Sequence, residues 1–289
     1  MKIRSHAKIN LWLHVTGKRE DGYHTLNTLM CRIGLADTIV LEPGGDGIRV
    51  SCDYPGVPED ENNLVFRAAD RFFSRLGKKG GVGIAIEKKI PVGAGLGGGS
   101  SNAAAVLCGL NRIFNAPFSS AVLQEMGLAI GADVPFFVEG RPALATGVGE
   151  VLSAVSGIAP WKVLVVYPGF SVSTARVFKK LNFELTKPEK KFKGSSLNNG
   201  GRRKPFAGPF DPVHNLRNDL EPVTARMHPV ILEVKRAMCR NGAAGSLMSG
   251  SGSAVFGLFS DGDEAAVAAD ALFLQGGGRW CVHLTELVL

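Results

Sequence analysis

The clearest pattern in the chain is an amphipathic spacing that predicts helices between short runs of β-forming residues. From Asn63 to Leu76 the apolar residues recur three and four positions apart, with Asn62 before this segment and Gly77 after it. A polar start and a glycine end are typical of a helix with its caps encoded in the sequence. We expect further helices over residues 100–114, 121–130, 173–181, 229–240 and 263–274.

Strand signals are intermixed with these helices. Val82 to Ile90 alternates between apolar and other residues, and Lys162 to Tyr167 is an almost continuous run of β formers. We expect further strands over residues 3–15, 38–42, 48–52, 254–259 and 280–285. Because the order shows no repeat and no regular strand–helix–strand alternation, it predicts an α+β fold of two domains rather than a barrel. We place the boundary near residue 160, which gives domains over 1–159 and 160–289.

Composition narrows the class of protein. Of 289 residues, 45% are hydrophobic and 20% are charged, which indicates a globular chain. No apolar run reaches the roughly 18–20 residues that span a bilayer, so we expect no membrane partner. The start of the chain lacks the apolar stretch of a signal peptide. Five scattered cysteines without a CxxC pair argue against a disulfide scaffold or a zinc ribbon, so we expect a cytoplasmic protein.

The net charge of +7 is concentrated in one segment. Residues 187–204 hold seven Lys or Arg residues against the single acid Glu189, together with Gly, Ser, Asn and Pro. Without periodicity, this composition predicts a solvated surface loop. A docking site for an anionic partner is the alternative. Since no aromatic platform for stacking bases accompanies the charge, we expect no nucleic-acid partner.

The most informative segment is the glycine-rich run over residues 91–105, which follows a predicted strand and precedes a predicted helix. Five glycines between residues 93 and 99 allow backbone conformations that side chains forbid. Consecutive N–H groups at a helix start form a concave site for anions. We place Ser100 and Ser101 at the N-cap of the helix. The segment therefore predicts a polyphosphate site.

Other interpretations of this run are weaker. A tight structural turn needs fewer glycines. Gly93, Gly95 and Gly98 satisfy the G-x-G-x-x-G pattern of dinucleotide folds, but the acid expected about 20 residues later is absent. No lysine follows as in a Walker A motif. A nucleoside triphosphate held by a different kind of loop is the leading interpretation.

The glycine run resembles the second motif of the GHMP small-molecule kinases. Further segments resemble one branch of that family, which acts on a cytidine diphosphate derivative in isoprenoid synthesis: residues 7–11, 17–26, 131–137, 147–150, 218–221 and 249–256. The matches run in order across most of the chain. The resemblance implies the two-domain GHMP kinase fold, with an N-terminal domain like the second domain of ribosomal protein S5 and a C-terminal ferredoxin-like α/β sandwich.

The resemblance also implies catalytic residues. Asp133 would be the base that takes a proton from the acceptor hydroxyl, and Lys8 would be its cationic partner. Taken alone, Asp133 is equally compatible with a turn residue that bonds its own backbone, and Lys8 with an edge-strand lysine. As a pair they make chemical sense, because a nearby lysine keeps a carboxylate ionised and offsets developing charge.

Binding residues follow from the same resemblance. Tyr23 would stack on a cytosine, His24 would bond its polar edge, and Phe178 would close the base site, although its helical spacing also suits a core residue. Further substrate contacts would come from Asn10, Thr174, Gly250 and Ser251, the last two being equally compatible with a structural turn. ATP would be held by Asn63, Lys88, Pro91, Gly93, Gly95, Leu96, Gly97, Gly98, Gly99, Ser100 and Ser101. Mg²⁺ is expected with ATP, without an assigned protein ligand.

The sequence thus predicts an ATP-dependent kinase of a cytidine-containing alcohol, acting as a monomer or weak homodimer. An alternative within the family is a kinase of the mevalonate or homoserine type, which the segment Asp21-Gly22-Tyr23-His24 disfavours. An alternative of another class is a non-catalytic module that binds anions or nucleic acid through residues 187–204.

Overall fold

The computed structural model describes residues 1–78, 80–181, 196–197, 203–204 and 211–289. The chain divides into two compact units. Unit 1 comprises Met1–Ala7, Leu35–Val92 and Gly97–Gly140, and unit 2 comprises Lys8–Gly34, Gly93–Leu96 and Arg141–Leu289. Two long strands, β1 (Lys2–Lys18) and β2 (His24–Pro43), contribute residues to both units. The sequence-based domain boundary after residue 159 stays a prediction.

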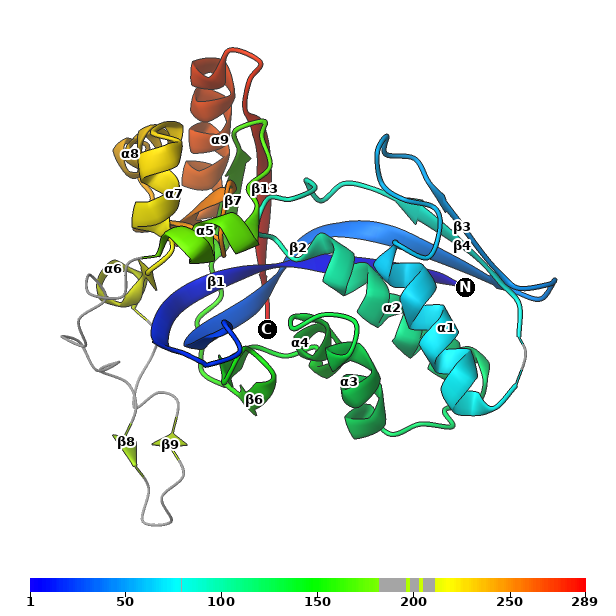
Figure 1. Ribbon diagram of the computed structural model, residues 1–289. Helices are drawn as coiled ribbons and strands as arrows, with labels where there is room; N and C mark the ends of the chain where they lie inside the picture. Colours follow the sequence, from blue (N-terminus) through cyan, green and yellow to red (C-terminus); the bar gives the residue numbers. More distant parts are fainter. Residues whose placement is uncertain (79, 182–195, 198–202, 205–210) are drawn as a thin grey trace. The chain divides into compact units, whose positions relative to one another are not determined.

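Unit 1 is a layer of strands with helices on one side. In it, β4 (Val82–Glu87) pairs antiparallel with the end of β2 and parallel with β3 (Ile48–Cys52). The helices lie on one side of these strands (Figure 1): α1 (Leu64–Leu76), α2 (Gly98–Ile113), α3 (Ser120–Leu128) and α4 (Val134–Glu139). The side chains that predicted α1 form its buried face: Val65, Ala68, Ala69, Phe72 and Phe73.

The ends of α1 confirm the caps expected from sequence. The Asn63 Oδ1 atom accepts a hydrogen bond from the backbone N–H of Val65 at 3.0 Å. At the other end Gly77 has φ +68°, the left-handed conformation that glycine adopts without a Cβ clash. Phe72 packs edge-on against Phe118, 5.3 Å between ring centroids. The helix is therefore fixed by its caps and by its aromatic face.

Unit 2 is built on a mixed sheet with the order β10-β1-β2-β13-β7-β12-β11. Its central strand is β7 (Lys162–Tyr167), which pairs antiparallel with both β12 (Val255–Phe259) and β13 (Cys281–Val288). The other strands are β10 (Arg217–Asn218), β11 (Gly245–Met248), β5 (Ala143–Thr146) and β6 (Val151–Ala154).

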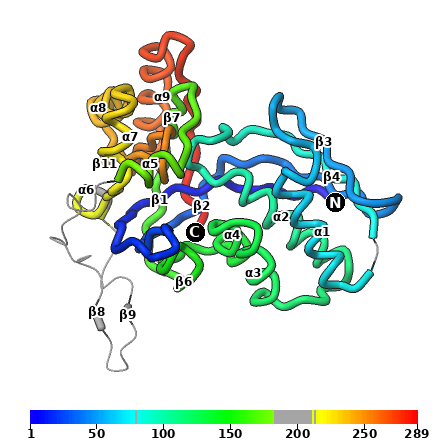
Figure 2. The backbone as a smooth tube through the Cα atoms, viewed as in Figure 1, coloured from blue at the N-terminus to red at the C-terminus, as the bar shows by residue number. Residues whose placement is uncertain are grey.

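Helices cover one face of this sheet. The tube in Figure 2 shows α7 (Glu221–Met227), α8 (Val230–Arg240) and α9 (Gly262–Gly276) on the same side of β7, and the chain passing from α9 into β13. The buried cluster between them includes Val166, Ile231, Met238 and Leu272. Two shorter helices complete the unit, α5 (Thr174–Lys180) and α6 (Pro212–Asn215).

Several short elements were not predicted from the sequence. Helix α4 has only six residues, with Pro135 in its first turn, so it offers too few positions for a periodic signal. The strands expected at residues 38–42 and 48–52 are present, and each pairs with β4.

Most of residues 187–204 lie outside the described residues. At the described positions of this segment, β8 (Ser196–Leu197) and β9 (Arg203–Lys204) form an antiparallel pair, where the sequence predicted a loop. No helix in the described part of the chain has the length and apolarity to cross a bilayer.

Candidate active site

The first half of the glycine run is anchored within unit 2 to the motif around residues 249–254. The Ser249 Oγ atom donates to the Gly95 carbonyl at 3.0 Å, and the Ala254 N–H donates to the Ala94 carbonyl at 3.0 Å. The Lys8 N–H donates to the Leu96 carbonyl at 2.9 Å. These bonds place the two glycine motifs beside each other, and Lys8 lies at the same place.

Gly95 is required by this close approach. Its φ is +78°, and a Cβ added to it would lie 2.1 Å from the Ser249 carbonyl oxygen, far below van der Waals contact. A side chain here would therefore separate the two motifs. The glycine serves close backbone contact as well as conformational freedom.

The second half of the run starts helix α2 in unit 1. Gly97 is the N-cap, with φ +72°, and the helix begins at Gly98. The placement of Ser100 and Ser101 at the N-cap is therefore wrong: both lie in the first turn, because the left-handed turn occurs three residues earlier at a glycine. The first-turn N–H groups of a helix have no intrahelical partner, and the helix dipole adds positive potential. This end of α2 can therefore receive phosphate oxygens.

The two serines have different surroundings. Ser101 is 3% exposed, and its Oγ accepts a hydrogen bond from Ser5 Oγ at 2.7 Å. Ser100 is partly exposed, and a Cβ built on Gly131 would lie 3.7 Å from its Oγ. Ser101 thus ties α2 to β1, whereas Ser100 is the better placed to touch a ligand.

Asp133 lies next to this helix start within unit 1. It is the N-cap position of α4, with φ −84° and ψ −12°, and its side chain forms no capping bond to α4. The turn that carries it is closed by a bond from the Val134 N–H to the Gly131 carbonyl, 3.0 Å. Gly131, at the start of this turn, lies close to Ser100 Oγ. The turn therefore holds Asp133 near the amino end of α2.

Lys8 belongs to a buried polar chain in unit 2. Its Nζ atom donates to Asn10 Oδ1 at 2.6 Å, and Asn10 Nδ2 donates to Thr28 Oγ1 at 2.8 Å. Lys8 is 4% exposed and Asn10 is 3% exposed. A Cβ on Gly250 would lie 3.4 Å from Lys8 Nζ and 3.5 Å from Asn10 Oδ1. Three predicted site residues, Lys8, Asn10 and Gly250, are therefore neighbours. The pairing of Lys8 with Asp133 involves both units and stays a prediction.

A second group in unit 2 contains the residues expected to hold a pyrimidine. The rings of His24 and Phe178 stack with centroids 5.0 Å apart and an angle of 25°. One turn earlier on α5, Thr174 Oγ1 lies 2.8 Å from Ser251 Oγ. Tyr23 is 67% exposed. Because the rings of His24 and Phe178 already stack on each other, the structure leaves no space for a third ring between them.

The imidazole of His24 is suited to neutral hydrogen bonding. Burial, with a smaller effect from the positive charge of Lys18, lowers the pKa of His24 below its ordinary value of 6.5. The ring is then neutral near pH 7, with one donor and one acceptor nitrogen. A pyrimidine edge carries the complementary groups.

Asn218 is a site residue whose role the sequence did not assign. Its Nδ2 atom donates to the carbonyls of Met248 and Gly250, each at 2.7 Å. Glu221 supports the same loop by accepting from the Met248 N–H at 2.8 Å. Both belong to residues 218–221, which resemble a family motif. Their contacts show that this motif shapes the loop bearing Gly250 and Ser251.

Asp37 was also missed. It is 0% exposed and accepts hydrogen bonds from the backbone of Lys89 and Ile90, both at 2.8 Å, and from Asn102 Nδ2 at 3.0 Å. It also forms an ion pair with Lys88. An acid between the apolar Ala36 and Ile39 was the available signal. Asp37 thus joins the segment before the glycine run to the first turn of α2.

Two residues predicted to bind ATP are engaged in the fold. The Lys88 side chain is 5% exposed and is held by Asp37. The Asn63 amide accepts from Val65 and donates to the Pro58 carbonyl at 2.6 Å. Their contacts with ATP stay predictions. Of the other predicted ATP residues, Leu96 is buried, Pro91 is partly exposed and Gly99 is exposed.

Comparison with known proteins gives a consistent result. Residues 63–141 match the family model for the N-terminal domain of GHMP kinases, and residues 211–276 match the C-terminal one. A protein of Syntrophotalea carbinolica described as 4-diphosphocytidyl-2-C-methyl-D-erythritol kinase is 48% identical over 275 residues, 94% of each chain.

Solved structures agree with these sequence matches. A crystal structure of 4-(cytidine 5'-diphospho)-2C-methyl-D-erythritol kinase is 38% identical with a TM-score of 0.81, and both chains are covered completely. Homoserine kinase from Cytophaga hutchinsonii is 19% identical with a TM-score of 0.70 over 98% of this chain and 94% of that one, which shows a shared fold. The predicted α+β GHMP kinase fold is confirmed.

Proposed function

The chain belongs to the GHMP kinase family of ATP-dependent small-molecule kinases, and we propose that it phosphorylates 4-diphosphocytidyl-2-C-methyl-D-erythritol on its 2-hydroxyl. The observation that carries the proposal is the contact between two glycine motifs 154 residues apart, beside Lys8 and Asn10. Its support includes the His24–Phe178 pair and the relatives of the same name. The reaction belongs to the non-mevalonate route to isopentenyl diphosphate.

In the proposed reaction, ATP phosphates bind the glycine run and the amino end of α2. Mg²⁺ would accompany the nucleotide and offset negative charge on its phosphates. Asp133 accepts the proton of the 2-hydroxyl while the hydroxyl oxygen bonds to the γ-phosphorus and the bond to ADP breaks. Lys8 keeps the carboxylate ionised and offsets negative charge. Asn10 orients the alcohol.

The cytidine end of the substrate is assigned to unit 2. Neutral His24 bonds the polar edge of the cytosine, and Tyr23 and Phe178 provide aromatic faces, each worth about 1–3 kcal/mol per stacked base. Thr174, Gly250 and Ser251 contact the substrate phosphates. Their support is the Thr174–Ser251 bond and the placement of Gly250 beside Lys8 and Asn10.

A coupled assay of ADP release tests the proposal directly. Purified enzyme with MgATP is offered the cytidyl alcohol, mevalonate or homoserine at equal concentration. We expect turnover with the cytidyl alcohol and rates at least a hundredfold lower with the other two. Preferential turnover of mevalonate or homoserine would assign the chain to another branch of the family.

We also propose that the protein acts in a reducing cytoplasm, as a monomer or weak homodimer. Five free cysteines support this, and burial raises the pKa of the Cys31 and Cys108 thiols, so both stay protonated and unreactive. Sedimentation velocity over a range of protein concentrations measures the association. A single species of fixed larger mass at all concentrations would contradict this part.

A further inference from the structure

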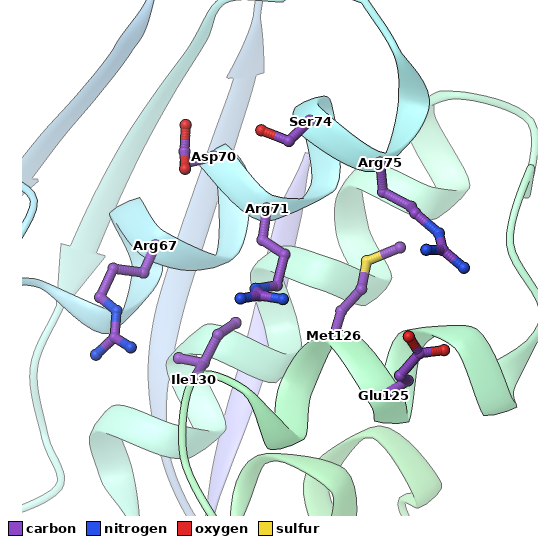
Figure 3. A pocket seen from close by; sticks show the side chains of 8 residues that line it. All are labelled: Arg67, Asp70, Arg71, Ser74, Arg75, Glu125, Met126 and Ile130. Atoms are coloured by element: carbon purple, nitrogen blue, oxygen red, sulfur yellow. The ribbon is translucent and has the colours of Figure 1, made fainter.

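A groove in unit 1 lies outside the residues assigned to the proposed reaction. It has a volume of about 460 Å³ and lies between α1 and α3 (Figure 3). Cavities of about 300–1,000 Å³ are typical of sites for small molecules. Its lining is Arg67, Asp70, Arg71, Ser74, Arg75, Glu125, Met126 and Ile130.

Three arginines form one edge of this groove. Arg67, Arg71 and Arg75 are four residues apart on α1, so they share one stripe of the helix, with about 6 Å between successive positions. Figure 3 shows all three pointing from α1 toward the side where Met126 and Ile130 lie, while Asp70 and Ser74 point the other way. The stripe therefore presents positive charge to the groove.

The guanidinium groups are available to a ligand. Arg67 donates to the Ala129 carbonyl across the groove at 3.5 Å, which is a long contact. Within the described part of the chain, neither Arg71 nor Arg75 forms an ion pair or a side-chain hydrogen bond. Guanidinium groups bind phosphate oxygens through paired N–H donors. Arg71 and Arg75, one turn apart, can each hold one phosphate group of a diphosphate.

The floor of the groove is apolar. Met126 is 4% exposed and Ile130 is 7% exposed, yet both line the groove below the arginines. Only a small part of this floor is exposed to the groove. A ligand with a hydrocarbon group beside its phosphates would cover it.

We propose that this groove binds an organic diphosphate that carries a short hydrocarbon group. The diphosphate pairs with Arg71 and Arg75, and the hydrocarbon packs on Met126 and Ile130. Glu125, on the other side of the groove, opposes the anion and limits its affinity. At its Arg67 end the groove reaches residues 129–131, which lie near Ser100. From there the groove runs along α1. The site is thus separate from the glycine run, which leads into α2.

Titration calorimetry with isopentenyl diphosphate, a five-carbon diphosphate, tests the site in the full-length protein. A saturating non-hydrolysable ATP analogue occupies the catalytic site during the titration. We expect one equivalent to bind, and the double variant Arg71→Gln/Arg75→Gln to bind at least tenfold more weakly. The variant Glu125→Gln should bind several-fold more tightly, because it removes a repulsive charge. Arg112→Gln, an exposed arginine on α2 outside the groove, is the control and should bind as the wild type does.

Two results would overturn the proposal: no saturable binding in the presence of the ATP analogue, or equal affinity in the double variant and the control. Inorganic diphosphate is the second probe and should bind about twofold more weakly than isopentenyl diphosphate, because little of the apolar floor is exposed. Equal affinity would contradict the hydrocarbon floor. Since these are binding measurements, they are independent of which alcohol the kinase phosphorylates.

Discussion

At the scale of single residues, Asp133 has the most specific expected effect. It lies on a turn beside the amino end of α2, where the proposed reaction needs a base. A base of this kind contributes about 10²–10⁴ to a rate. We expect Asp133→Asn to lower kcat by that factor in the ADP-release assay, while calorimetry shows ATP binding within about threefold of the wild type.

The matched control is Asp263→Asn, in the exposed first turn of α9. It removes a carboxylate of the same kind from unit 2 and should leave kcat unchanged. Wild-type turnover in Asp133→Asn would disprove the assignment. Loss of ATP binding in that variant would instead indicate a structural role for the turn.

Asp37 governs stability rather than chemistry. With Asp37 replaced by Leu, the buried Lys88 would lose its ion-pair partner, and breaking a buried pair costs about 3–5 kcal/mol of unfolding free energy. The double variant Asp37→Leu/Lys88→Met removes both charges and should recover only part of that loss, because the donors of Lys89, Ile90 and Asn102 stay unpaired. Urea denaturation of the four proteins of this cycle measures the coupling. Additive losses would show that the two side chains act independently.

At the scale of elements, the glycine run is sensitive to position. We expect Gly95→Ala to lower ATP affinity at least tenfold, because its Cβ would lie 2.1 Å from the Ser249 carbonyl in a left-handed backbone. Gly262→Ala is the control: it lies outside the glycine run, at the start of α9, and its Cβ would meet only Lys162 Cε at 3.7 Å. Calorimetry with ATP compares the two. Similar affinities would show that the contact between the motifs does not shape the phosphate site.

Strand β13 should give the fold a pH dependence. Burial lowers the pKa of His283 below 6.5, so the folded chain binds its proton less readily than the unfolded chain does. The unfolding free energy therefore falls as pH drops below about 6.5, by at most about 1.4 kcal/mol per pH unit for one group. His283→Gln should flatten this slope in denaturation at pH 7 and pH 5.5. An unchanged slope would exclude His283 as its source.

The elements differ in how far the sequence could predict them. Helix α1 was predictable because its apolar spacing and both caps are local features. The N-cap of α2 was misplaced because five glycines leave the start of the helix undetermined, and the turn at Gly97 is fixed by its fold context. The roles of Asp37 and Asn218 depend on contacts with residues 50 and 30 positions away or more, which no local pattern contains. Motif resemblance supplied the site, and the structure supplied its supporting contacts.

At the scale of the whole molecule, the charge and the proposed catalysis should be separable. The net charge of +7 comes largely from residues 187–204, whereas every predicted site residue lies outside that segment. A positively charged segment acts on anions over about a Debye length, roughly 8–10 Å at moderate salt, and long-range attraction of this kind supplies no aligned catalytic group.

We therefore expect a variant with residues 189–204 replaced by a short Gly-Ser linker to keep kcat and KM for the cytidyl alcohol within about threefold of the wild type. Its net charge falls to +2, so adsorption to a heparin column should be lost at lower salt than for the intact chain, because such binding weakens as salt screens the charge. The matched control replaces only the basic residues of this segment with Gln at unchanged length. Loss of turnover in both variants would show that the basic residues of this segment take part in catalysis or substrate binding. The segment would then be an anion-binding surface coupled to the kinase and not an independent loop.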